Sequence, residues 1–207
     1  AEMDSLRIKN EVIAYDRGLE LNDLLFKYGA RVNSDLVMDL QSDKLPFDVN
    51  GNGQFDYLIW NYFPVFASAS NHPINKNIGF VSGKFVNSID TVGAEGIKKT
   101  FLLSSSRNSR TIATPALISG NENVNAPQDE KFNKANIPVA VLLEGKFQSL
   151  FANRLSQAMN DSLEKYGAIF LSQSLYENKI IVVADGDIPL NSVQKNEPLP
   201  MGMNPFT

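Results

Sequence analysis

The sequence predicts an α/β fold in which helices and strands form layers around one sheet, with some antiparallel hairpins. Two apolar runs, Pro138–Leu143 and Lys179–Ala184, have the composition of strands buried on both faces. Between them, apolar residues recur every four positions from Phe147 to Leu163, which predicts helical structure up to Gly167, either continuous or broken midway. A strand, a helix and a strand in this order predict a βαβ unit with a parallel strand pair and a right-handed crossover.

The amino-terminal half contributes a further helix and strand. Leucines at helical spacing precede Tyr28, and Gly29 is a natural helix stop. The segment Val32–Leu40 then reads as a strand. A helix that ends at a glycine and is followed by a strand is typical of layered α/β structure. We also expect a strand over Lys99–Leu103, with Thr111–Ile118 pairing back as its hairpin partner.

Composition excludes several classes of function. The chain has 207 residues and a formal net charge of −4, with 43% hydrophobic residues, so we expect a single domain over residues 1–207. It has no cysteine and one histidine, which excludes thiol catalysis, disulfides, iron–sulfur clusters and multi-histidine metal sites. We therefore expect no metal and no cofactor. The mild acidity argues against a nucleic-acid partner.

The apolar runs are too short to cross a bilayer, which needs about 20 residues. The first residues, Ala1–Ser5, are polar and do not resemble a signal peptide. The stretch from Pro198 to Thr207 reads as an irregular tail. We expect the chain to be a fragment of a longer protein.

Three short motifs resemble parts of known sites, and each lacks an essential element. The run Asp48–Gly53 matches half of a calcium loop, but Ile59 stands where the bidentate glutamate should be, so an Asn-Gly turn is the better interpretation. The run Gly79–Lys84 is one residue short of a phosphate loop, and Phe85 replaces the required hydroxyl. No G-x-S-x-G motif, which would supply the serine of a catalytic triad, occurs in the sequence. We therefore interpret His72, the only histidine, as a loop residue hydrogen-bonded to the backbone.

Polar residues at strand ends give the candidate binding residues. Ser104, Ser105, Arg107 and Arg110 follow an apolar strand and can hold an anion, although a solvated hairpin loop would look the same.

Carboxylates follow the two buried strands. Glu144, with Lys146 next to it, ends the first strand, and Asp185 and Asp187 end the second. If the strands are parallel neighbours, these carboxylates crowd one edge of the sheet. The simpler interpretation is that they bond turn amides or cap helices.

Two alternatives to a non-catalytic binding module stay open. Paired carboxylates about 5–10 Å apart would support a hydrolase acting on a glycan. Trp60, Tyr62 and Phe63 would form the stacking platform of a sugar or peptide receptor, although we favour a place in the core for these aromatics.

Five segments, in order along the chain, resemble the GldG-type gliding-motility ABC transporter auxiliary protein of Bacteroidetes. They are Leu24–Val32, Trp60–Pro64, Lys98–Arg107, Leu143–Phe151 and Val183–Asp187. Each segment alone is weakly specific, and the ordered set is more so.

The resemblance implies a flavodoxin-like fold, related in shape to glutamine-amidotransferase-like modules. It implies a substrate-binding-like, extracytoplasmic component that works with a separate permease and a separate ATPase. It also places the soluble part at the periplasmic face of the inner membrane, between membrane helices outside this fragment. No catalytic residue is carried over, and the missing cysteine excludes amidotransferase activity.

Overall fold

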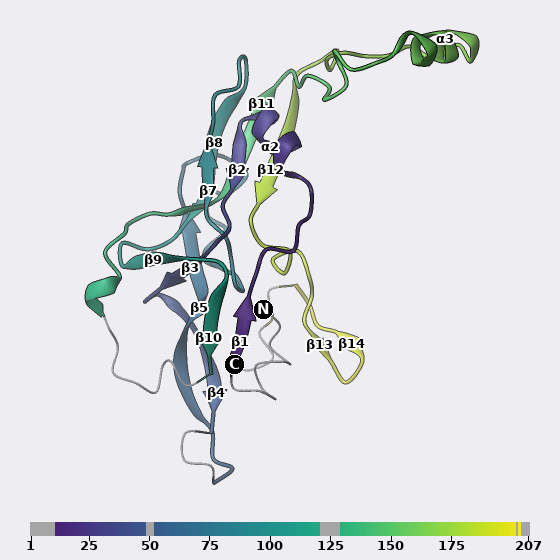
Figure 1. The fold of residues 1–207 in the computed structure, drawn as a ribbon. Helices are drawn as coiled ribbons and strands as arrows, with labels where there is room; N and C mark the ends of the chain where they lie inside the picture. The colour runs from purple at the N-terminus through teal and green to yellow at the C-terminus, as the bar shows by residue number, and fades with distance from the viewer. Residues whose placement is uncertain (1–10, 49–51, 121–128, 202, 204–207) are drawn as a thin grey trace.

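The computed structural model describes residues 11–48, 52–120, 129–201 and 203. Within these residues the chain is mostly strand, and its largest sheet is a curled antiparallel one with the order β12-β11-β8-β5-β4 and β6 on β5 (Figure 1). Two-stranded sheets pair β1 with β10, β2 with β7, β3 with β9 and β13 with β14. The strands are β1 (Glu11–Ala14), β2 (Ala30–Val32), β3 (Asp35–Asp39), β4 (Ser42–Phe47), β5 (Asp56–Ser68), β6 (Val81–Ser82), β7 (Ile89–Thr91), β8 (Lys98–Ser104), β9 (Ser109–Ala113), β10 (Ala116–Ser119), β11 (Pro138–Gly145), β12 (Asn178–Val183), β13 (Val193–Gln194) and β14 (Glu197–Pro198).

The two strands predicted in the last third are confirmed as β11 and β12, but only β11 is buried as predicted. β12 lies at the edge of the sheet, where Val182 is its one buried residue and Ile181 is 48% exposed. The predicted parallel direction is also wrong. The strands are antiparallel, with Ala140 opposite Val183 and Glu144 opposite Lys179. Residues that follow β11 leave the sheet and return at the same end, where Gly145 pairs with Asn178. An apolar run reports burial and not direction, so the βαβ unit could not be distinguished from a long hairpin.

The described residues do not show the layered, flavodoxin-like α/β arrangement that the sequence predicted. Helical structure is limited to α2 (Asn22–Tyr28), α3 (Gln157–Lys165) and the 3-10 helix η1 (Asp129–Lys131). None of the residues of α3 is buried, so it does not cover a face of the sheet. The antiparallel hairpins of the prediction are therefore the part that the structure supports.

The amino-terminal helix is confirmed. Gly29 ends α2 in the left-handed conformation, with φ 98°, and its N–H bonds back to the last turn. Leu25 and Tyr28 of α2 pack against the larger apolar cluster. The expected hairpin between 99–103 and 111–118 is wrong, because β9 pairs with β3 and β10 pairs with β1.

The core consists of two apolar clusters. The larger cluster surrounds β11, whose residues Val139, Val141, Leu142 and Leu143 are fully buried, as a strand with neighbours on both edges should be. The smaller cluster is built around Trp60 and Tyr62. β5 contributes to both, since Phe66 belongs to the larger cluster.

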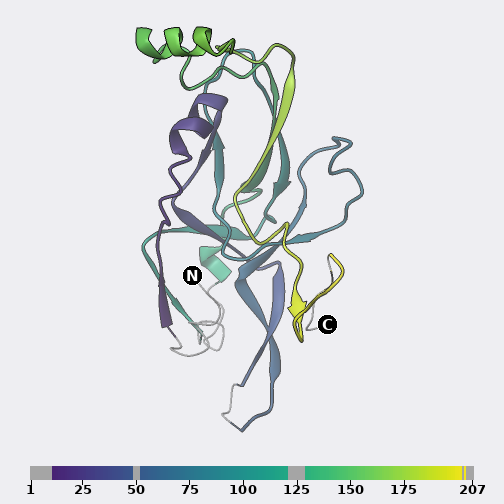
Figure 2. The same ribbon diagram turned by 90° about the vertical axis from the view of Figure 1, so that its right-hand side faces the viewer.

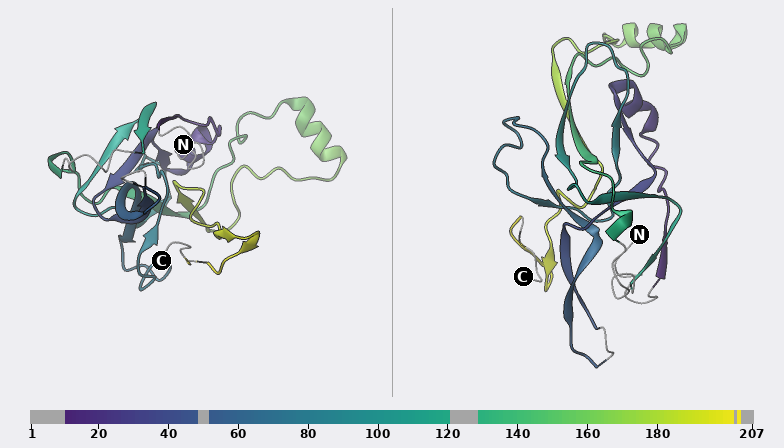
Figure 3. Two further views of the ribbon diagram at one scale, coloured as in Figure 1. Left: turned by 90° about the horizontal axis from the view of Figure 1, so that it is seen from below. Right: turned by 90° about the vertical axis from the view of Figure 1, so that its left-hand side faces the viewer.

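Two elements extend from the body in opposite directions. Figures 1 and 2 show α3 beyond one end of the sheet and the β4–β5 hairpin beyond the other, and Figure 3 shows how far α3 stands from the remaining strands. No helix among the described residues combines the length and apolar character that a membrane span requires.

Candidate functional site

The predicted site residues lie at opposite ends of β11. Ser104 pairs with Pro138 at the beginning of β11, and Ala184, next to Asp185, donates its N–H to Val139 O there. Glu144 is at the other end. Five residues of strand, roughly 17 Å, separate Val139 from Glu144. The carboxylates of Glu144 and Asp185 therefore do not form the close pair that glycoside hydrolysis requires, and the geometry removes the hydrolase alternative.

The loop after β8 is held from inside by a buried aspartate that sequence reasoning missed. Asp39, at the end of β3, is fully buried. Its carboxylate accepts hydrogen bonds from Ser106 N–H at 2.7 Å, from Ser106 Oγ at 2.6 Å and from Gln41 N–H at 2.8 Å. The sequence signal was an aspartate ending an apolar strand. This carboxylate fixes the path of the 104–110 loop.

The serines of this loop face inward. Ser105 Oγ accepts a hydrogen bond from Ile137 N–H at 2.8 Å and lies 2.7 Å from Ser109 Oγ. Ser104 and Ser105 are both buried. The Ser105 hydroxyl thus supports the loop, and neither serine faces solvent.

The two arginines of the loop differ in their surroundings. Arg107 is exposed, so its charge is available to an anionic group. Arg110 is half-buried and places its guanidinium 5.1 Å from the centre of the Phe132 ring, a cation–π contact.

Asp185 holds a second loop to the same end of the sheet. Its carboxylate accepts hydrogen bonds from Lys84 N–H and Asp187 N–H, both at 2.8 Å. Burial raises the pKa of Asp185, and these two N–H groups oppose that rise. Asp187 is exposed beside it. Asp185 is therefore a structural acceptor, whereas Asp187 faces solvent.

The Gly79–Lys84 run was expected to be a turn between short strands, but it contains the short strand β6, which pairs with β5, and the chain bends after Gly83. Gly83 lies so close to the core that a Cβ there would sit 2.5 Å from Val86 Cγ2 and 2.7 Å from the Phe66 ring. The glycine thus serves close packing, and the Lys84 amide is already bonded to Asp185.

The calcium-like and histidine motifs also serve local structure. Asp48 accepts hydrogen bonds from Asn52 N–H at 3.1 Å and Gly53 N–H at 3.0 Å, and Asn50 lies outside the described residues. His72 Nδ1 accepts from Ile74 N–H at 3.2 Å. Among the residues that the structure describes, no three His, Asp or Glu side chains are placed to hold a metal ion.

The aromatic residues proposed as a stacking platform are core residues. Trp60, Tyr62 and Phe63 are at most 4% exposed. The ring centres of Trp60 and Tyr62 lie 5.3 Å apart, inside the smaller cluster. The structure confirms the core interpretation, and the receptor alternative loses its platform.

Glu144 is an ion-pair centre at the other end of β11. It lies 2.9 Å from Lys179 Nζ on β12 and 3.5 Å from Lys98 Nζ on β8. The hydrogen bond from Lys179 is the main reason that the pKa of Glu144 is lowered, and the charge of Lys98 adds to it. Lys146 is exposed one turn further on.

The ion pairs of Glu144 predict a pH dependence of stability. A carboxyl whose pKa is lower in the folded than in the unfolded chain stabilises the fold above its ordinary value of 4.5 and loses that contribution as the pH falls. Glu144→Gln should therefore reduce the loss of unfolding free energy between pH 6 and pH 3, measured by urea denaturation. Glu164→Gln, on the exposed α3, is the control and should leave the pH profile unchanged; identical profiles for both variants would contradict this role of Glu144.

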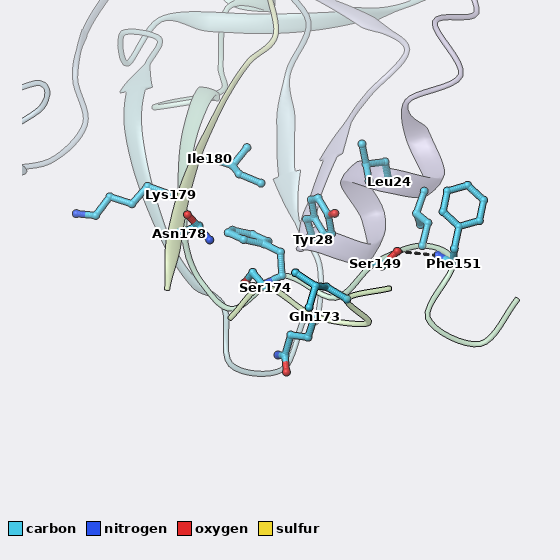
Figure 4. Close-up of a pocket in the computed structure, with 12 residues that line it drawn as sticks. Leu24, Tyr28, Ser149, Phe151, Gln173, Ser174, Asn178, Lys179 and Ile180 are labelled. Carbon is cyan, nitrogen blue, oxygen red and sulfur yellow. Dashed lines mark hydrogen bonds between the residues drawn. The ribbon is translucent and has the colours of Figure 1, made fainter. Parts of the chain in front are cut away.

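An open cavity lies beside Glu144 and was not foreseen. It has a volume of about 740 Å³ and lies between α2, the start of β12 and the segments that connect β11 to β12 (Figure 4). The rings of Tyr28 and Phe147 meet in it with centres 4.9 Å apart. The lining is Leu24, Tyr28, Phe147, Ser149, Leu150, Phe151, Leu171, Gln173, Ser174, Asn178, Lys179 and Ile180. No local pattern could reveal it, because three distant segments build it.

Comparison with known proteins gives one family. A family model described as an ABC-type uncharacterized transport system matches residues 1–207. Neither a curated protein nor a solved structure matches the chain. The family consists of auxiliary components, which indicates a role in transport other than catalysis. Because the match covers the whole chain, the protein belongs to this family of ABC-type transport system auxiliary proteins.

Proposed function

We propose that the protein is a non-catalytic, extracytoplasmic binding or scaffolding component of an ABC transporter. In this proposal it works at the periplasmic face of the inner membrane with a separate permease and a separate ATPase, in a complex associated with gliding motility. The observation that carries the proposal is the family match over residues 1–207. The resemblance of five ordered segments to the GldG-type protein supports the narrower assignment.

The strand-end surface, which we define as residues 104–110 and 185–187, is the proposed contact with the transporter. Its two loops are fixed by Asp39 and Asp185, which bond backbone amides of Ser106 and Lys84. A loop that is already ordered loses little conformational entropy on binding. The exposed charges of Arg107 and Asp187 would then select the partner.

The test uses the protein at its native length, purified from its own membranes. Arg107→Ala and Asp187→Ala should each lower the amount of co-purifying permease and ATPase several-fold, with an unchanged melting temperature, since both side chains are exposed. Lys146→Ala, an exposed charge at the opposite end of β11, is the matched control. Full recovery of both subunits with the two variants, or equal loss with Lys146→Ala, would contradict the proposed surface.

A further inference from the structure

The segment that joins β11 to β12, residues 146–177, is an arm that extends from the body. Its base is a narrow ribbon, in which Ser149 N–H donates to Ser172 O and Ser174 N–H donates to Phe147 O, both at 2.9 Å. Its far part carries α3, which stands away from the sheet in Figures 1 and 3. None of the residues of α3 is buried against the described residues.

This helix is too short to be stable by itself. It has nine residues, whereas isolated helices shorter than about 12–15 residues are marginal in water. Ser156 caps its first turn by accepting a hydrogen bond from Met159 N–H at 3.3 Å. In proteins, most of the stability of a helix comes from packing an apolar face. The helix therefore requires a surface to pack on.

The arm offers apolar side chains for such packing. Met159, Leu163 and Tyr166 follow each other at intervals of four and three residues, which places them on one side of the helix. Met159 is 57% exposed and Tyr166 is 80% exposed. We call these three residues the α3 stripe.

The charges of the arm favour a protein surface over a membrane. A helix that lies on anionic lipid carries a basic polar face. On α3, by contrast, Asp161 and Glu164 outnumber the single basic residue, Lys165. Residues 146–177 have no net charge, because the basic residues Lys146, Arg154 and Lys165 balance the acidic residues Asp161, Glu164 and Glu177. Two copies of the arm therefore do not repel each other through their net charge.

The chain itself contains an apolar cavity that suits the α3 stripe. The 740 Å³ cavity lies at the base of the arm and is lined mainly by apolar side chains, among them Leu24, Tyr28 and Leu171. It is open to solvent along one side, so the face of a helix can lie against its lining. The α3 stripe of the same chain does not fill it, because α3 lies beyond the base.

We propose that two copies of the chain exchange arms, so that the α3 stripe of each copy packs into the cavity at the base of the other copy's arm. The stripe is near the tip of the arm and the cavity is at its base, so two antiparallel arms related by a two-fold axis bring each stripe to the opposite cavity. Such a contact is isologous and closes after two copies. The strand-end surface lies at the other end of β11 and stays open, so the dimer is independent of transporter binding.

The first experiment measures the oligomeric state of the 207-residue chain by sedimentation equilibrium. We expect a dimer whose Kd rises by about tenfold or more in Met159→Glu, which places a charge in the α3 stripe. Gln157→Glu adds the same charge on the opposite side of α3 and should leave the Kd unchanged. A chain that stays monomeric at all concentrations, or a dimer that Met159→Glu does not weaken, would overturn the proposal.

The second experiment tests the geometry by cross-linking, and the absence of native cysteine leaves no competing thiol. Chains with Met159→Cys are mixed with mass-tagged chains that carry Leu24→Cys, and the mixture is oxidised. We expect a disulfide between the two kinds of chain, and much less of it when Gln157→Cys replaces Met159→Cys. Equal yields from both positions, or no mixed disulfide, would refute the exchange of arms even if a dimer forms.

Discussion

Phe66→Ala is expected to lower the free energy of unfolding by about 3–5 kcal/mol, as is usual when a buried phenylalanine is truncated. The Phe66 side chain is fully buried in the larger cluster, and the backbone of Gly83 lies against its ring. Because Gly83 has no side chain that could move into the space left by the ring, we expect that space to stay largely unfilled.

Urea denaturation, followed by the fluorescence of Trp60, measures the effect of Phe66→Ala. The substitution leaves this single tryptophan in place. Phe55→Ala is the matched control, because Phe55 is 63% exposed and should lose at most about 0.5 kcal/mol. A loss below about 1 kcal/mol for Phe66→Ala would mean that the larger cluster is not packed as the structure shows.

Asp39→Ala is expected to cost about 3 kcal/mol. The carboxylate is fully buried and accepts three hydrogen bonds, and its removal leaves the N–H groups of Ser106 and Gln41 without their acceptor. The loss acts on the 104–110 loop in particular, so amide exchange of Ser106 should become faster than amide exchange in β11.

Asp39→Asn separates the charge of the side chain from its shape. The amide keeps one acceptor oxygen at nearly the same volume, so we expect a loss smaller than that of Asp39→Ala. Ser106→Ala removes the hydroxyl bond to Asp39 and the bond that Asn108 N–H donates to the same hydroxyl at 3.0 Å, and it should cost about 1–2 kcal/mol. If Asp39→Ala exchanges the Ser106 amide at the rate of the parent chain, Asp39 does not hold the loop.

The sequence located the strands and the burial of β11, and it was much less informative about the burial of β12 and about strand direction. It located β11, β12, α2 with its stop at Gly29, and the core position of Trp60. It misjudged the connection at 146–177, where helical spacing begins at Phe147 but the helix covers only Gln157–Lys165. Hydrogen bonds from Ser149 N–H to Ser172 O and from Ser174 N–H to Phe147 O hold the first part of that connection as a ribbon, and no pattern within either segment shows that they pair.

The candidate site could be predicted only in part, because its contacts join distant residues. The bond from Ser106 to Asp39 spans 67 residues, and the bond from Lys84 to Asp185 spans 101. The sequence identified Asp185 and the serines as polar groups at strand ends. Their partners are backbone amides, which every residue carries, so composition cannot reveal which amide a carboxylate will bind.

β5 couples the unfolding of the two apolar clusters. Thirteen consecutive residues carry Trp60 and Tyr62 into one cluster and Phe66 into the other. Neither cluster can open without disturbing a strand that forms a wall of its neighbour, so the chain gains cooperativity from covalent continuity as well as from contact area. Half-folded species, in which one cluster is intact and the other is exposed to aggregation, are thereby disfavoured.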